Sequence, residues 1–166
     1  QSSATRAFVG DNASITANNV TLDATSGTEA KSDVLYVGIS GFVGVSVSDT
    51  TATADHDTEA TVGPNATLTL TGDLNATATG TSKATPVISA ADLSAGVGVQ
   101  VLSANSLISS RTRAAIDDGA DVGADDVTLT ATGTHTLLSD IGSIGFAGIV
   151  SASDIISAPL KVLLLL

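Results

Sequence analysis

Two acidic clusters are the first candidates for chemistry. One is Asp55-His56-Asp57, and the other is the run from Asp117 to Asp126. Closely spaced aspartates in glycine-rich turns offer the hard oxygen ligands that Ca²⁺ prefers. The spacing matches neither an EF-hand loop nor a nonapeptide calcium repeat, and solvated turns with local backbone hydrogen bonds are the alternative. The candidate ligands for Ca²⁺, the one cofactor that the sequence suggests, are Asp117, Asp118, Asp121, Asp125 and Asp126.

Three N-x-S/T sequons form a second set of candidate sites. They begin at Asn12, Asn65 and Asn75. Asn12 and Asn65 fall at the same place in a repeated phrase that reads as a turn, so we expect both to be exposed. Such triplets also arise by chance in a chain rich in threonine and serine. They are candidate glycosylation sites in an archaeal or eukaryotic secreted protein and would stay bare in a bacterial one.

Residues for catalysis are sparse. The chain has no cysteine, only two histidines (His56 and His135) and six lysines and arginines. No Ser-His-Asp arrangement follows from the spacing, and a β-helical lyase or hydrolase would need an acid, a base and cations in one groove. We therefore expect no enzymatic activity and assign no catalytic residue.

Threonine recurs at every second residue in three stretches. These stretches are 67–71, 77–81 and 128–136. Because alternate residues of a strand face the same side, stacked runs would form a flat threonine face that could bind ice. Ordinary β-propensity and solubility explain the same runs more simply. The first part of the chain has no such run, which interrupts a regular array.

The composition restricts both the core and the partners. Of the 166 residues, 43% are apolar and 2% aromatic, so small and β-branched side chains must build the core. The formal net charge of −11 argues against nucleic acid and anionic lipid surfaces, which both attract Lys and Arg. The C-terminal apolar run is too short to span a membrane. The absence of cysteine fits secreted bacterial or archaeal surface proteins, and we expect an extracellular or cell-surface location.

The elements that must position these residues repeat along the chain. "TRAFVGDNASITA" from Thr5 returns as "TEATVGPNATLTL" from Thr58 and as "TRAAIDDGADVGA" from Thr112. One inserted residue near Asp73 aligns the middle copy with the first. A glycine-rich second half also repeats, as "SGFVGVSVSD", "SAGVGVQVLS" and "IGFAGIVSAS". The chain therefore divides into three units of about 53 residues, 5–57, 58–110 and 111–166, within one repeat domain.

Each unit alternates apolar and polar residues with the period of a β-strand, and no segment has a convincing helical period. We predict an all-β fold, a β-solenoid (β-helix) in which like residues of successive coils stack into ladders. Coils of about 18–26 residues would place two or three coils in each unit. The glycine-rich halves read as strands buried on both sides. A jelly-roll-like β-sandwich fibre subunit is the alternative fold.

The repeat resembles those of large bacterial surface adhesins of the filamentous-haemagglutinin-like and leukotoxin-like kind. The resemblance covers most of the chain and implies a long extracellular β-helical stalk that adheres or builds matrix; it transfers no catalytic residue. The third copy departs from the pattern, with Ile116-Asp117 in place of Val-Gly. In the first unit the pattern is carried by Thr5, Ala7, Val9, Gly10, Ala13, Ile15, Ala17, Val20, Thr21, Leu22, Gly41, Val43, Gly44, Val45 and Val47.

The last stretch of the chain, residues 159–166, is its most apolar part. Leucines left in water favour aggregation, so we expect this tail to be covered by the chain or by a neighbour. We predict a non-enzymatic structural or adhesive protein that forms part of a surface fibre by head-to-tail stacking of copies, with host or cell-surface glycans as further partners. A sandwich subunit that donates a strand and an ice-binding solenoid are the alternatives. The candidate subunit contacts are Leu160, Val162, Leu163, Leu164, Leu165 and Leu166.

Overall fold

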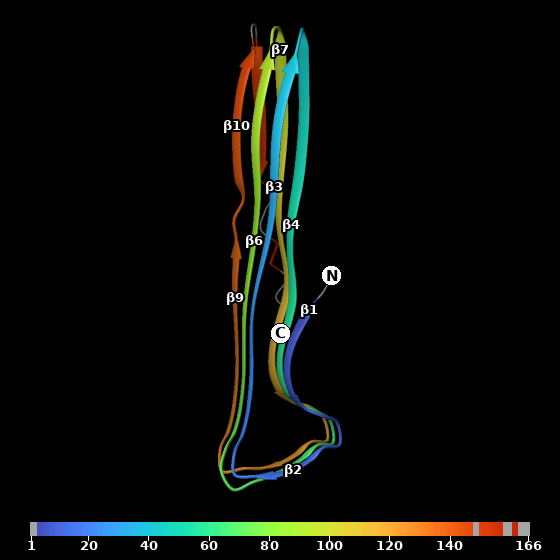
Figure 1. Cartoon of the computed structure of the whole chain (residues 1–166), viewed down its shortest axis with the longest axis vertical. Helices are drawn as coiled ribbons and strands as arrows, with labels where there is room; N and C mark the ends of the chain where they lie inside the picture. The colour runs from blue at the N-terminus through green and yellow to red at the C-terminus, as the bar shows by residue number, and fades with distance from the viewer. Residues whose placement is uncertain (1–2, 148–149, 158–160, 163–166) are drawn as a thin grey trace.

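A computed structural model describes residues 3–147, 150–157 and 161–162 and shows an all-β molecule with a long arm and a short foot (Figure 1). Every strand pairing in this part of the chain is parallel and joins residues 53 or 54 positions apart. Such pairing stacks successive repeats and confirms the β-solenoid. The β-sandwich alternative is wrong for the described residues, because it requires antiparallel neighbours.

Three sheets form the walls of the solenoid. One side of the arm contains β3 (Val20–Ser40), β6 (Leu74–Ser94), β9 (Val127–Leu137) and β10 (Asp140–Ala147). The facing side contains β1 (Ser3–Val9), β4 (Val43–Val62), β7 (Val97–Ile116), β11 (Val150–Ser157) and β12 (Lys161–Val162). The foot contains β2 (Ser14–Ala17), β5 (Thr67–Leu70) and β8 (Asp121–Gly123).

Each repeat unit forms one coil, so the prediction of two or three coils in each unit is wrong. The chain runs along the foot, up β3, over a tight bend at the tip and down β4, where it pairs with its own start in β1 (Figure 1). A strand of 21 residues spans about 70 Å, which explains why a whole unit is used up in one turn. The inserted residue near Asp73 is confirmed, because the pairing offset changes from 53 in β2–β5 to 54 in β3–β6.

Pro86 lies beside the break between β9 and β10 in the third coil. It is fully buried inside β6, a strand with neighbours on both sides. Proline has no N–H to donate to a ladder, so a central strand tolerates it only where pairing is interrupted. The third coil leaves this gap at Leu138 and Ser139, between β9 and β10.

The side chains that fill the interior become smaller from the foot to the arm. The foot holds the largest apolar cluster, which contains Val62, Leu68 and Leu74. In the arm the facing sheets are separated mainly by alanines, such as Ala54 and Ala78, and by hydroxyl pairs. Ser26 Oγ lies 2.5 Å from Thr58 Oγ1, and Ser82 Oγ lies 2.8 Å from Ser110 Oγ. These short side chains let the two sheets approach closely and satisfy the polar groups between them.

The upper part of the arm, beyond Asp33 on β3 and Asp49 on β4, differs from the prediction for the glycine-rich halves. We define it as the upper arm, and the part between it and the foot as the lower arm. Its strands are buried on one side only, the inner one, where Ser46, Asp92 and Gln100 lie. Most of its large apolar residues, such as Ile39, Val45 and Phe146, face outward, although Ile88 and Leu102 face inward in a small apolar cluster. Inward and outward positions continue to alternate without a break through β3 and β4. Above Asp33 and Asp49, however, most of the large apolar residues occupy the positions that point outward.

Candidate interaction surfaces

The corner that joins the arm to the foot is a stacked β-turn. The amide of Ala13 donates to Gly10 O, and the amides of Ala66 and Ala120 form the same bond in the next two coils. The third turn residue has a left-handed backbone in every coil, with φ of 56° at Asn12, 55° at Asn65 and 76° at Gly119. Asparagine and glycine are the residues that adopt this conformation most readily. The third copy therefore keeps the turn although it lacks the Val-Gly pair.

This corner exposes both repeat-equivalent sequon asparagines. Asn12 and Asn65 are solvent-exposed at the turn, whereas Asn75 is half-buried in β6. The turns also bond to one another, since the amide of Asn12 donates to Pro64 O at 2.9 Å and that of Asn65 to Asp118 O at 3.2 Å. The corner is thus a rigid ladder with its side chains available to solvent.

The five aspartates of the candidate Ca²⁺ site are spread along the foot. Asp117 and Asp118 lie at the corner near the arm, Asp121 begins β8, and Asp125 and Asp126 lie at the opposite corner. Asp117 is paired with Arg113. Among the described residues, no three histidine or acidic side chains are placed to share a metal ion. The structure therefore does not gather the five carboxylates at one point.

The two histidines occupy inward positions in different coils. His56 lies beside the first coil, where Nδ1 is 2.6 Å from Ser3 Oγ and Nε2 is 3.0 Å from Thr5 Oγ1. His135 lies on β9 in the third coil, in register with Ser82. His56 thus contacts hydroxyl groups of the neighbouring coil, whereas Nδ1 of His135 is buried without a hydrogen-bond partner among the described residues. The two histidines do not share a site.

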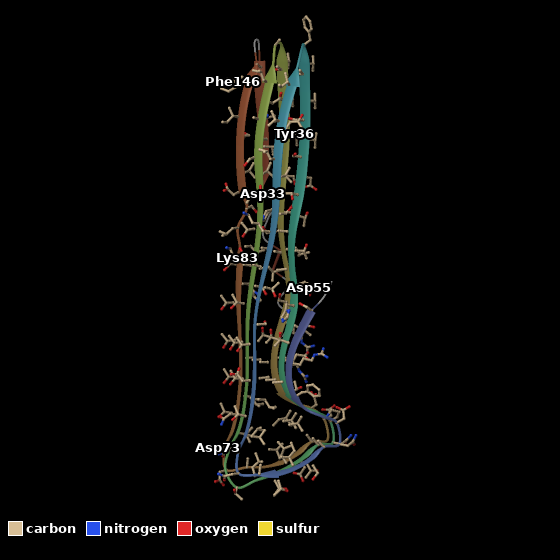
Figure 2. All side chains as sticks on the ribbon, viewed as in Figure 1. Asp33, Tyr36, Asp55, Asp73, Lys83 and Phe146 are labelled. Carbon is tan, nitrogen blue, oxygen red and sulfur yellow. The ribbon has the colours of Figure 1, made fainter. Side chains whose placement is uncertain are left out.

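The outer face of the lower arm carries an array of threonines. Twelve outward positions on β3, β6 and β9 stack as four columns across three coils. The structure aligns the runs that the sequence shows separately, and oxygen-tipped side chains follow one another along the outer side of this sheet (Figure 2). Nine of the twelve positions are threonine: Thr21, Thr25, Thr77, Thr79, Thr81, Thr128, Thr130, Thr132 and Thr134.

The opposite sheet of the lower arm carries charges in rows across the coils. Glu59 Oε2 lies 2.9 Å from Arg6 Nε, and Glu59 Oε1 lies 3.9 Å from Arg111 Nη1. Lys83 and Glu29 form a similar pair between coils, at 3.0 Å, on the threonine face. Opposite charges at neighbouring positions stabilise a parallel stack and keep the repeats in register.

The two end coils leave their inward side chains partly in solvent. In the middle coil Leu74 and Ala76 are fully buried. Their partners in the third coil, Val127 and Leu129, are 47% and 42% exposed, and those in the first coil are only half-buried. The strands of the end coils also have one neighbour fewer than those of the middle coil within the described ranges.

The upper arm exposes a continuous apolar surface. Ile39 and Phe42 are 81% and 88% exposed, and Phe146 points away from the arm near the tip (Figure 2). Among the residues whose side chains are described, Asp92 is the only charged one in this region, and it faces inward. Register places Asp154 beside Val101 at the lower limit of the surface. Its other large exposed members are Leu35, Val37, Val43, Val45, Val47, Leu93, Val97 and Ile144.

A shallow groove runs along this surface on the β3–β6–β10 side. Its floor is the middle coil, where Ser89 and Ala91 are small. Its walls are the larger residues of the flanking coils, Val37 and Ile39 on one side and Ile144 and Phe146 on the other. Sequence reasoning missed this surface, although alternating Gly or Ser with Val in residues 43–48 was a signal for it.

The predicted C-terminal contact surface lies mostly outside the described residues. Leu160 and Leu163–Leu166 are among those that the structure does not describe, and Val162 pairs with Ile108 in β12. No helix in the described ranges is long and apolar enough to cross a membrane. Comparisons with family models, curated proteins and solved structures give no match to this chain.

Proposed function

We propose that this chain is a non-enzymatic structural module of an extracellular fibre, in which coils continue into neighbouring coils of the same or another chain. The observation that carries the proposal is the difference in burial between the middle and end coils. Stacking one more coil on β9 would bury Val127 and Leu129 and would pair the outer edge of β9, which has β6 as its one neighbour among the described strands. Burial of apolar area yields about 25 cal/mol per Å², and edge pairing adds backbone hydrogen bonds. The resemblance to adhesin repeats agrees with this role.

A substitution that places a charged side chain on the inward side of an end coil tests the proposal. We expect the purified chain to form elongated particles by electron microscopy and to sediment as a concentration-dependent series. Leu129→Lys places a charge on the inward side of β9 and should abolish this growth, because an added coil would bury it. Thr130→Lys, on the outward side of the same strand, is the matched control and should still grow. A monodisperse wild-type monomer without fibres would contradict the proposal.

The apolar surface of the upper arm gives the fibre a lateral contact, which we assign to a second copy of the chain. The chain carries a net charge of −11, so copies repel one another except across an uncharged surface. In a two-fold pair, the Ile144 and Phe146 wall of one copy would lie against the Ser89 and Ala91 floor of the other, and the reverse. Lipid is a poorer occupant, because the end coils would leave unpaired backbone groups in hydrocarbon.

Light scattering after gel filtration tests the lateral contact separately from end growth. In the Leu129→Lys background, where coils cannot extend, we expect a dimer that persists in high salt. Ile144→Ser with Phe146→Ser should give a monomer, whereas Val45→Ser with Val47→Ser, on the other face, should remain dimeric. Dimers that survive the groove substitutions would exclude this surface, and a lipid-binding monomer would assign it to membranes.

The threonine face favours a second function, ice binding. Its columns repeat at about 4.8 Å between coils and about 6.6 Å along each strand, so hydroxyl and methyl groups form a regular two-dimensional array. Thermal hysteresis of the purified chain measures this activity directly. Thr79→Lys at the centre of the array should abolish it, and Thr53→Lys on the opposite sheet should not. A wild-type solution without hysteresis would exclude the function.

A further inference from the structure

Charged residues in neighbouring coils of the chain are matched in sign. Among the described strands, four register pairs join an acidic residue to a lysine or arginine, and none joins two residues of like charge. Opposite charges at neighbouring positions stabilise a stack, and like charges weaken it. The four pairs are Arg6 with Glu59, Glu29 with Lys83, Asp57 with Arg111 and Glu59 with Arg113.

The two end coils carry a positive charge in one column where the middle coil carries a negative one. Glu59 lies in register between Arg6 and Arg113. Its carboxylate bonds to Arg6, whereas the Arg113 side chain bonds to Asp117 of its own coil. A further coil stacked on either end of the chain would therefore meet an arginine at this position.

Two acidic columns repeat this arrangement with an uncharged residue in the middle. Asp33 and Asp140 both lie in register with Val87, and both are exposed on the outer side of the arm. Asp140 forms no ion pair within the described part of the chain. The other acidic column lies at the corner between arm and foot, where the second turn residues are Asp11, Pro64 and Asp118.

These columns decide which coil fits on the edge of the third coil that faces away from the second. If another copy stacked its first coil there in register, Arg6 would lie beside Arg113, and Asp33 beside Asp140. Strands in such a stack are about 4.8 Å apart, so the like charges would repel one another. A coil with the residues of the second coil would instead bring a glutamate to Arg113 and a valine to Asp140.

We propose that the fibre alternates two types of coil, so that the third coil selects a neighbour of the second type. Such a neighbour carries a carboxylate in the Arg113 column and an uncharged residue in the Asp140 column. This inference rests on the proposed end-to-end stacking and adds the chemistry that selects the partner. A copy that presents its first coil stacks more weakly, and high salt strengthens that contact because it screens the like charges.

Exchanging charges in the Asp33 and Asp140 column tests the selection. All variants also carry Ile144→Ser and Phe146→Ser, which remove the lateral contact. Asp33→Lys and Asp140→Lys each place opposite charges at the junction between copies, so sedimentation velocity at low salt should show growth at about fivefold lower protein concentration. The double variant places two lysines side by side. Its growth should return to the level of the parent with both aspartates, although its net charge is the furthest from −11.

Asp121→Lys is the matched control for net charge. It makes the same change in the third coil, but its column holds only Ser14 and Thr67, so it should change growth far less. An equal gain from Asp121→Lys, or the greatest growth in the double variant, would show that net charge alone governs stacking. Either result would overturn the inference and leave the proposed function intact. A lack of growth in every variant, at low and at high salt, would contradict both.

Discussion

The lower and upper arm use the same backbone in opposite ways. Both are built from the same continuous strands, β3 and β4 in the first coil and β6 and β7 in the second. In the lower arm mainly alanine and hydroxyl side chains face inward and threonine faces outward. In the upper arm valine faces outward, and the interior combines Ile88, Ala90 and Leu102 with serine, glycine and aspartate. Because the parallel ladder crosses this change without a break, the register must be determined elsewhere. The large apolar cluster of the foot and the hydrogen-bonded corners are the parts that fix it.

The strongest test of this comparison replaces leucine in the foot and in the upper arm. Leu68 is 1% exposed and Leu35 is 78% exposed. We expect Leu68→Ala to lower the free energy of unfolding by about 2–5 kcal/mol, because it removes apolar contacts and leaves a cavity. Leu35→Ala should change it by less than about 0.5 kcal/mol. Urea unfolding followed by circular dichroism measures both, and similar losses would mean that the upper arm is as important for stability as the foot.

A second test adds a larger side chain at an inward position of each half, in the buried middle coil of the lower arm and in the third coil of the upper arm. Ala78 is fully buried between the sheets of the lower arm, whereas a methyl group added to Gly145 in the upper arm would meet no atom within 4 Å. Ala78→Leu should cost about 1–3 kcal/mol of unfolding free energy through overpacking. Gly145→Ala should be neutral or stabilise by up to about 1 kcal/mol, because it restricts the unfolded chain. A large loss from Gly145→Ala would show that the inward side of the third coil is covered at this position.

The third test concerns the corner that fixes the register. Asn65 has a left-handed backbone, which alanine adopts only with strain. We expect Asn65→Ala to lower the free energy of unfolding by about 1 kcal/mol and Asn65→Gly to restore it, as glycine does at Gly119 in the third coil. Equal effects of the two substitutions in the same urea titration would show that the side chain of Asn65, and not its backbone, is what matters.

The smallest effect on stability is expected when the two outer surfaces are exchanged. Val45 and Val47 in the upper arm are more than 60% exposed. Replacing both with threonine keeps their shape and should change the free energy of unfolding by less than about 0.5 kcal/mol. The same variant should bind less of a dye that recognises exposed apolar surface, and Thr130→Val with Thr132→Val should bind more. Unchanged dye binding in both variants would contradict the conclusion that the upper arm has an apolar outer surface and the lower arm a polar one.

Much of the fold follows from the repeat alone. Like residues at intervals of 53 or 54 in the sequence become register partners, as Ala7 and Ala60 do, and the inserted residue near Asp73 lies at the corner where it disturbs no ladder. The number of coils could not be inferred in the same way. Coil length depends on how long the strands run, and strands of 20 or 21 residues are far longer than the usual 3–10.

The candidate surfaces were harder to predict. The sequence contains the threonine runs, but only the stacked register shows that Thr25, Thr79 and Thr132 form one column. The exposure of Val45 and Ile39 contradicts the expectation that apolar runs are buried, since alternation tells which residues share a face and not which face is inside. That choice is made by the apolar cluster and the corners of the foot together with the alanines of the lower arm, many residues away on the same strands.

Because each repeat unit forms a single coil, each layer of the stack contains an unusually long piece of chain, and this determines how the molecule responds to tension. A coil adds only about 4.8 Å to the height of the stack, yet it contains 53 or 54 residues, which extend to about 180 Å when pulled out. In a fibre of such coils that is stretched along its axis, each coil that is released becomes nearly forty times longer than the height it added to the stack. The neighbouring coils keep their own ladders, so the extension proceeds in steps and dissipates a sudden load before the whole stack fails.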